Sequence, residues 1–163
     1  MTDLELTRTP GDRRLFALGE IGTLRFEGLM SRAAVADAGT RRWRIARHGF
    51  WGRVVEATDE TGAVVGEFTP RGLRRGGMLR WGGRELGLRP SSAWRERYAL
   101  FDGEREVATL DGKGWGRRPV AVSVADVDTI DPGLLLFSAF VVRRLAEDAN
   151  AAAGAGAGAA SSG

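Results

Sequence analysis

Three neighbouring aspartates, Asp126, Asp128 and Asp131, come nearest to the spacing of a metal site. A calcium loop of the EF-hand type would also need an oxygen ligand at position 130 and a glutamate at position 137. The sequence has Ile130 and Phe137 at those positions. The spacing therefore favours a solvated loop in which Asp131 caps a following helix, and we expect no metal site. A weak calcium site at the three aspartates is the alternative.

Residue combinations typical of catalysis do not occur in this chain. His48 is the only histidine, there is no cysteine, and neither an HExxH nor a GxSxG motif is found. We expect His48 to lie in a turn. Lys113 follows Gly112, but the first glycine of a phosphate-binding loop is missing. The sequence therefore predicts a protein that is not an enzyme and has no cofactor.

A short unit with tryptophan, a glycine turn and arginine occurs three times, at residues 50–53, 81–84 and 115–118. At a membrane surface, such a ring would lie in the interfacial layer and the cation would contact a phosphate. Alternatively, the rings close the ends of a protein core and the arginines are solvated, which is the commoner use of large aromatic residues.

A basic run at Arg71, Arg74 and Arg75 could also contact phosphates, together with Arg41 and Arg42. Nucleic-acid binding is not favoured, because it would also need aromatic residues exposed among the cations on one face. The candidate residues for an anionic ligand are Trp51, Arg53, Arg71, Arg74, Arg75, Trp81, Arg84, Lys113, Trp115, Arg117 and Arg118.

Most of the chain upstream of residue 125 has the alternating pattern of half-buried β-strands joined by turn sequences. In the segment 42–47, for example, Trp43 and Ile45 are expected to face inward and Arg42 and Arg44 outward. The Asp-Gly pair at 102–103 is the strongest hairpin signal. The predicted strands are 21–27, 33–36, 42–47, 53–58, 63–69, 77–81, 84–88, 94–101, 104–110 and 118–124.

One helix is predicted at 132–149, with Asp131 as its N-cap and Pro132 at its first position. Arg143 and Arg144 lie toward its C-terminal end, where the helix dipole favours cations. Its segment 133–142 has no polar face, so it is either a core helix or a membrane span. This run is about half of the ~20 residues that a bilayer crossing needs, so we interpret it as a core helix.

These elements predict an all-β protein with one helix, a closed antiparallel β-barrel wrapped around a buried, apolar C-terminal α-helix. A sandwich with a packed helix is less suitable, because its helix would be polar on one side. Residues 1–19 are expected to form a polar lead-in and residues 20–150 the barrel domain. The Ala/Gly/Ser segment 151–163 is expected to be disordered.

The pattern resembles the tubby-like barrel of the LURP-one-related and phospholipid-scramblase group. The similar parts are the hairpins RVVEATDETGAVVGEF and RERYALFDGEREVATL, and the order VAVSV, ADVDTID, GLLLFSAFVV. The resemblance implies twelve strands around a central helix, no known catalytic residues, and a link to membranes or anionic phospholipids. The chain lacks the proline- and cysteine-rich N-terminal part of the scramblases, so lipid translocation is not implied.

The function expected from the sequence is that of a non-enzymatic module that binds acidic phospholipid headgroups or another anionic ligand. The net charge of +3 does not by itself argue for such a partner. The first 14 residues contain no apolar run of the secretory type, so a cytoplasmic protein with peripheral membrane association is expected. The alternative is a structural or adaptor protein that binds a protein partner through a strand edge or the barrel mouth.

Overall fold

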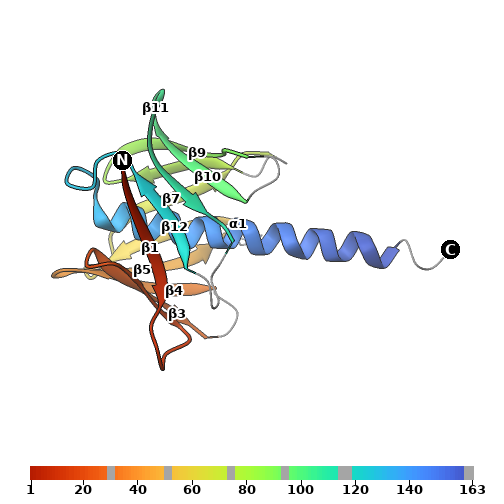
Figure 1. Cartoon of the computed structure of the whole chain (residues 1–163), viewed down its shortest axis with the longest axis horizontal. Helices are drawn as coiled ribbons and strands as arrows, with labels where there is room; N and C mark the ends of the chain where they lie inside the picture. Colours follow the sequence, from red (N-terminus) through yellow and green to blue (C-terminus); the bar gives the residue numbers. More distant parts are fainter. Residues whose placement is uncertain (29–31, 50–52, 73–75, 93–95, 114–118, 160–163) are drawn as a thin grey trace.

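A closed barrel of twelve antiparallel strands surrounds the first half of a single long helix (Figure 1). The computed structural model describes residues 1–28, 32–49, 53–72, 76–92, 96–113 and 119–159. Each strand pairs with its neighbours in sequence, and the ring closes where the first strand pairs with the last, with Leu4 opposite Val122. The fold class predicted from the sequence is confirmed.

The strands follow one another as an up-and-down meander without crossovers. Their bounds are β1 Thr2–Arg8, β2 Leu15–Leu18, β3 Gly22–Glu27, β4 Ala33–Ala38, β5 Arg41–His48, β6 Val54–Asp59, β7 Val64–Pro70, β8 Gly77–Trp81, β9 Arg84–Pro90, β10 Arg97–Asp102, β11 Arg105–Asp111 and β12 Val120–Val124. Every strand predicted from the sequence is present, and His48 is the last residue of β5 rather than a turn residue.

The helix α1, Pro132–Ala159, fills the barrel with side chains on all of its sides. All residues from Leu134 to Val142 are buried, because strands surround this part of the helix in every direction. This enclosure explains why its sequence has no polar face. Aromatic contacts join helix and wall; for example, the rings of Phe140 and Phe26 stack with centroids 5.8 Å apart.

The N-terminal segment is part of the barrel, so the prediction of a polar lead-in at 1–19 is wrong. β1 and β2 lie within it, and Leu6 and Leu18 are fully buried. β1 and β2 can form with few apolar residues, because backbone pairing of β1 with β12 and of β2 with β3 holds them in the barrel.

The predicted disorder of the Ala/Gly/Ser tail 151–163 is wrong for residues 151–159, because α1 continues through them, and residues 160–163 lie outside the described residues. Alanine has the highest helix propensity, and extending an existing helix avoids the cost of nucleation. The helix therefore extends past the barrel (Figure 1). Arg143 and Arg144 thus lie in mid-helix, and the helix dipole does not explain their position.

The barrel has two distinct ends, named here by the course of α1. The entry end is where the helix begins, at the left of Figure 1, and the exit end is where it leaves, at the right. Since the strands alternate in direction, successive connections alternate between the ends. Connections that follow odd-numbered strands lie at the exit end, and those that follow even-numbered strands at the entry end.

Two tryptophans close the entry end over the start of α1. Trp43 and Trp81 are buried, and their rings meet edge to face with centroids 5.7 Å apart. Trp81 also contacts Phe137 of the helix at 5.5 Å. Gly133 passes beneath both rings, and a Cβ at this position would lie 2.5 Å from Trp81 and 2.8 Å from Trp43. Only a glycine lets the helix enter this close to the rings.

We therefore expect Gly133→Ala to destabilise the protein, although alanine is the better helix former. Overpacking of this kind costs about 1–3 kcal/mol in the free energy of unfolding. The matched control is Gly154→Ala, at a helical position where an added Cβ meets nothing within 4 Å. The control should be neutral or stabilise by up to about 1 kcal/mol. Urea unfolding of both variants measures the difference, and equal stabilities would contradict the proposed close approach.

Candidate functional site

The connections at the entry end are acidic. They comprise residues 19–21, 39–40, 60–63, 82–83, 103–104 and 125–131, all within the part of the chain that the structure describes. These connections hold six carboxylates and no lysine or arginine. The six are Glu20, Glu60, Glu104, Asp126, Asp128 and Asp131.

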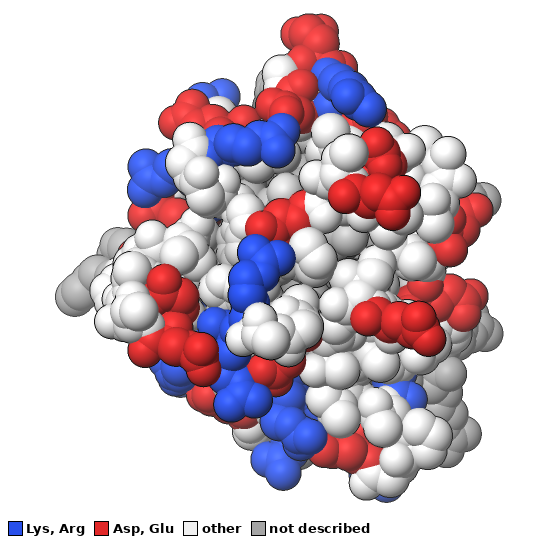
Figure 2. All heavy atoms as spheres, turned by 90° about the vertical axis from the view of Figure 1, so that its left-hand side faces the viewer, with Lys and Arg blue, Asp and Glu red and all other residues white. Residues whose placement is uncertain are grey.

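Arginines that begin the adjacent strands pair with nearby carboxylates of this end. Arg41 contacts Asp131 at 3.0 Å and Arg42 contacts Asp37 at 2.6 Å. Figure 2 views the entry end and shows acidic side chains distributed over it with basic ones between them. The cations at this end are therefore largely neutralised.

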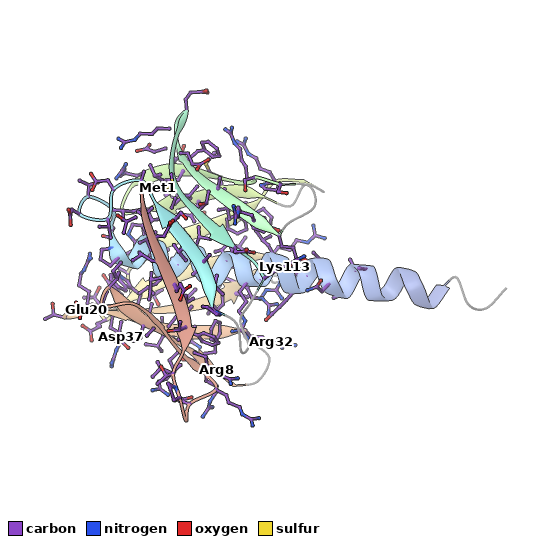
Figure 3. All side chains as sticks on the ribbon, viewed as in Figure 1. Met1, Arg8, Glu20, Arg32, Asp37 and Lys113 are labelled. Carbon is purple, nitrogen blue, oxygen red and sulfur yellow. The ribbon has the colours of Figure 1, made fainter. Side chains whose placement is uncertain are left out.

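The connections at the exit end are basic. Among their described residues are six exposed cations, Arg13, Arg14, Arg32, Arg53, Arg71 and Lys113. The described carboxylates in the same connections are Asp12 and Glu96. Figure 3 labels Arg32 and Lys113 on the side where the helix leaves, and Glu20 on the opposite side. The two ends of the barrel thus carry opposite charge.

A cavity at the entry end, of about 410 Å³, lies beside the tryptophan pair. Trp43, Trp81, Arg41 and Asp131 belong to its lining. The guanidinium of Arg41 lies 5.0 Å from the centre of the Trp43 ring and also donates to Asp131. The lining also contains Arg42, Asp59 and Glu60, so two cations stand against three carboxylates and this cavity has no excess of positive charge.

A second cavity, of about 390 Å³, opens at the exit end between α1 and strands β5 to β7. Its charged lining consists of Arg47, Arg53, Arg144 and one carboxylate, Asp148. Arg47 donates to Asp148 at 2.9 Å, and Arg144 approaches the same carboxylate at 3.6 Å. Arg144 also donates to Glu147 at 2.5 Å, a carboxylate beside the cavity. Three lining cations against Asp148 and Glu147 leave the cavity with a small excess of positive charge.

Arg144 is the most deeply placed of these cations, with 8% of its surface exposed. Burial lowers its pKa, and the positive charge of Arg47 lowers it further, while Glu147 and Asp148 act in the opposite direction. Arginine remains protonated in proteins despite such shifts. The cavity therefore holds a buried permanent charge that would be stabilised by an additional anion.

The structure separates the candidate residues predicted from the sequence. Arg53, Arg71 and Lys113 lie at the exit end, whereas Trp81 and Arg84 lie at the entry end. Trp81 is buried and Arg84 pairs with Asp102, so this turn is used in closing the core. The candidates Trp51, Arg74, Arg75, Trp115, Arg117 and Arg118 lie outside the described residues.

Two of the three cations that line the exit-end cavity were not among the candidates, Arg47 and Arg144. A signal for Arg47 exists in the sequence, since it continues the inward-facing alternation of Trp43 and Ile45 along β5. Arg144 follows directly on the uniformly apolar part of the helix. In both cases a cation occupies a position where the pattern predicts an inward side chain.

The aspartates before the helix act in turns and capping. Asp126 accepts from the Asp128 amide at 3.2 Å, and Asp131 accepts from the Gly133 amide at 2.7 Å. Within the described residues, no group of three His, Cys, Asp or Glu side chains has the geometry to hold a metal ion. The exposed His48 lies 3.7 Å from Glu56 on the barrel wall.

Comparisons with protein-family models, with curated proteins and with solved structures found no match to this chain. Among the described residues, no helix combines the length and apolarity required for a membrane span.

The ion pair at the start of the helix predicts a dependence of stability on acid pH. Burial alone raises the pKa of Asp131, but hydrogen bonds from Arg41 and the Gly133 amide outweigh it and hold the pKa below its usual value. Because the pKa of Asp131 is lower in the folded than in the unfolded protein, its ionised carboxylate stabilises the fold fully above the unfolded-state pKa of about 3.9. It is lost as the pH falls through the lower, folded-state pKa.

We therefore expect Asp131→Asn to reduce the loss of stability below pH 4, since the titrating group is gone. Asparagine keeps the N-cap acceptor, whereas Asp131→Ala removes it and should cost about 1 kcal/mol more at pH 7. Thermal unfolding of the three proteins between pH 2 and pH 7 measures both effects. An unchanged acid profile in Asp131→Asn would contradict the role assigned to the ion pair.

Proposed function

We propose that this protein is a non-enzymatic module that binds acidic membrane surfaces through the exit end of its barrel. The observation that carries the proposal is the separation of charge between the two ends. Electrostatic attraction to anionic lipids contributes about 1 kcal/mol per cation near the surface. Six exposed described cations at one end can act together, whereas cations spread over all faces cannot.

The exposed position of these cations supports binding rather than a structural role. Arg53, Arg71 and Lys113 are exposed, and the structure gives them no ion pair among its described residues. The arginines Arg41, Arg42 and Arg84 near the entry end do have carboxylate partners. Arg105 at the entry end also has no ion pair among the described residues, against the six exposed cations of the exit-end connections, so cations without a carboxylate partner are more numerous at the exit end.

The proposed relationship to the LURP-one-related and scramblase-like barrels is consistent with membrane binding. Twelve strands around a central helix are what that resemblance implies, and this chain has them. Membrane association occurs in several members of that group, so the resemblance supports the same function.

An adaptor that binds a protein partner is the second candidate. The ring of strands is closed, so within the described residues each strand pairs on both sides and no free strand edge is offered. Such a partner would therefore bind at a barrel end. The exit-end cations would then select an acidic protein surface.

Sedimentation with vesicles tests the membrane proposal. We expect the protein to sediment with vesicles that contain phosphatidylserine but not with neutral phosphatidylcholine vesicles, and binding should fall as salt rises. Reversing Arg53, Arg71 and Lys113 together to glutamate should weaken binding by at least 3 kcal/mol, or roughly a hundredfold.

The matched control compares the reversal of one arginine at the exit end with the reversal of one arginine at the entry end. Arg71→Glu and Arg105→Glu change the net charge equally, and both residues are exposed, but Arg105 begins β11 at the entry end. Only Arg71→Glu should weaken vesicle binding. Equal effects would show that net charge alone acts, and binding of oligonucleotides as tight as that of acidic vesicles would overturn the preference for lipid.

A further inference from the structure

The exit-end cavity combines a cationic rim with an apolar wall. Phe68 of β7 is buried behind it, and Val141 and Leu145 of α1 line its helical side. Arg47, Arg53 and Arg144 supply the charge. A volume of about 390 Å³ is enough for a phosphate group together with several methylene groups. The lining therefore matches an anion that is attached to an apolar chain, better than it matches a bare ion.

Arg47 gives an independent indication that this cavity can receive a hydrogen-bond acceptor. Its Nη2 donates to Asp148, but its Nε is buried and has no hydrogen-bond partner within the described part of the protein. A buried donor without an acceptor is costly, and native structures usually explain it by a water, an ion or a ligand. An anionic oxygen in the cavity would supply an acceptor.

Asp148 places a carboxylate of the protein itself among the arginines of this cavity. It lies 2.9 Å from Arg47 and 3.6 Å from Arg144, and its side chain is 53% exposed. Its own negative charge offsets one of the three cations. A more highly charged oxyanion could displace this exposed side chain into solvent and engage the arginines with more hydrogen bonds.

We propose that the exit-end cavity is a binding site for a phosphate monoester that carries an alkyl chain, and that Asp148 occupies the position of its anionic group when the site is empty. Arg53 and Arg144 contact the phosphate from the two sides of the cavity. Val141, Leu145 and Phe68 contact the first methylene groups of the chain. This inference rests on the proposed function, since it identifies which group of a membrane surface the exit end would take.

Octyl phosphate below its micelle concentration is the probe, compared with inorganic phosphate and with octanol by isothermal titration calorimetry. We expect octyl phosphate to bind at least tenfold more tightly than inorganic phosphate, because the apolar wall adds to the charge contact. Octanol should not bind measurably. Equal affinity for octyl phosphate and inorganic phosphate would overturn the proposal.

Three variants test the assigned residues. Arg53→Gln changes an exposed side chain and should weaken octyl phosphate binding roughly tenfold without altering the melting temperature. Asp148→Asn should strengthen binding several-fold, because a competing charge is removed. Arg105→Gln, at the opposite end, is the matched control and should change nothing. Binding that is weakened equally in the control, or no change in Arg53→Gln, would contradict the site.

Arg144→Met tests the buried cation and keeps most of the side-chain volume. We expect the folded variant to bind octyl phosphate at least tenfold more weakly. Unchanged octyl phosphate binding by folded Arg144→Met contradicts the site. If Arg144→Met does not fold, the affinity of Arg53→Gln for octyl phosphate decides whether the site exists.

The vesicle and octyl phosphate experiments can fail separately. Vesicle binding that depends on Arg71 and Lys113, with no binding of octyl phosphate, would leave the membrane proposal standing and remove the cavity site. Octyl phosphate binding that Arg53→Gln weakens, without vesicle binding, would support the cavity as a site for a free alkyl phosphate. The membrane proposal would then be wrong.

Discussion

The structure depends on the need to cover a helix that is apolar on every side. Leu134 to Val142 cannot face water in any direction, and a single sheet or a sandwich would cover only part of this surface. A closed ring of twelve strands covers all of it and also leaves no open sheet edge. The helix and the ring therefore require each other. The long-range pairing of β1 with β12, which closes the ring, follows from the same requirement.

The up-and-down topology then decides where charge accumulates. Along the sequence, acidic and basic connections alternate: Asp12-Arg13-Arg14 is followed by Glu20, then by Arg32, and the pattern continues toward Asp131. No long stretch of the chain is strongly basic or strongly acidic. Antiparallel strands send alternate connections to opposite ends, so the barrel sorts this sequence into an acidic and a basic pole. The entry-end connections carry six negative charges, and the described exit-end connections carry six positive and two negative charges, a separation that the net charge of +3 does not reveal.

Much of the fold could be predicted from local sequence, and most of the site could not. Alternation placed Trp43 and Ile45 inward, and the Asp-Gly turn placed β10 beside β11, because these signals act over a few residues. β1 was missed because the alternation of Leu4 and Leu6 with Asp3 and Glu5 is short, and because one of its two partners, β12, is more than a hundred residues away in the chain. The exit-end cavity joins Arg47 of β5 to Arg144 of α1, a contact that exists only once the helix is enclosed. The separation of acidic and basic connections likewise could not be predicted before the order of the strands was known.

The part of the helix inside the barrel also sets the distance between the acidic and the basic pole. Asp131 at the entry end and Arg144 at the exit end are 13 residues apart in the sequence, or roughly 20 Å along an α-helix. This is more than twice the Debye length of about 8 Å at physiological salt. An anionic surface in contact with the exit end is thus screened from the carboxylates of the entry end. Under the proposed function, such a surface would interact with the basic pole alone, so a protein of modest net charge would bind it in one orientation.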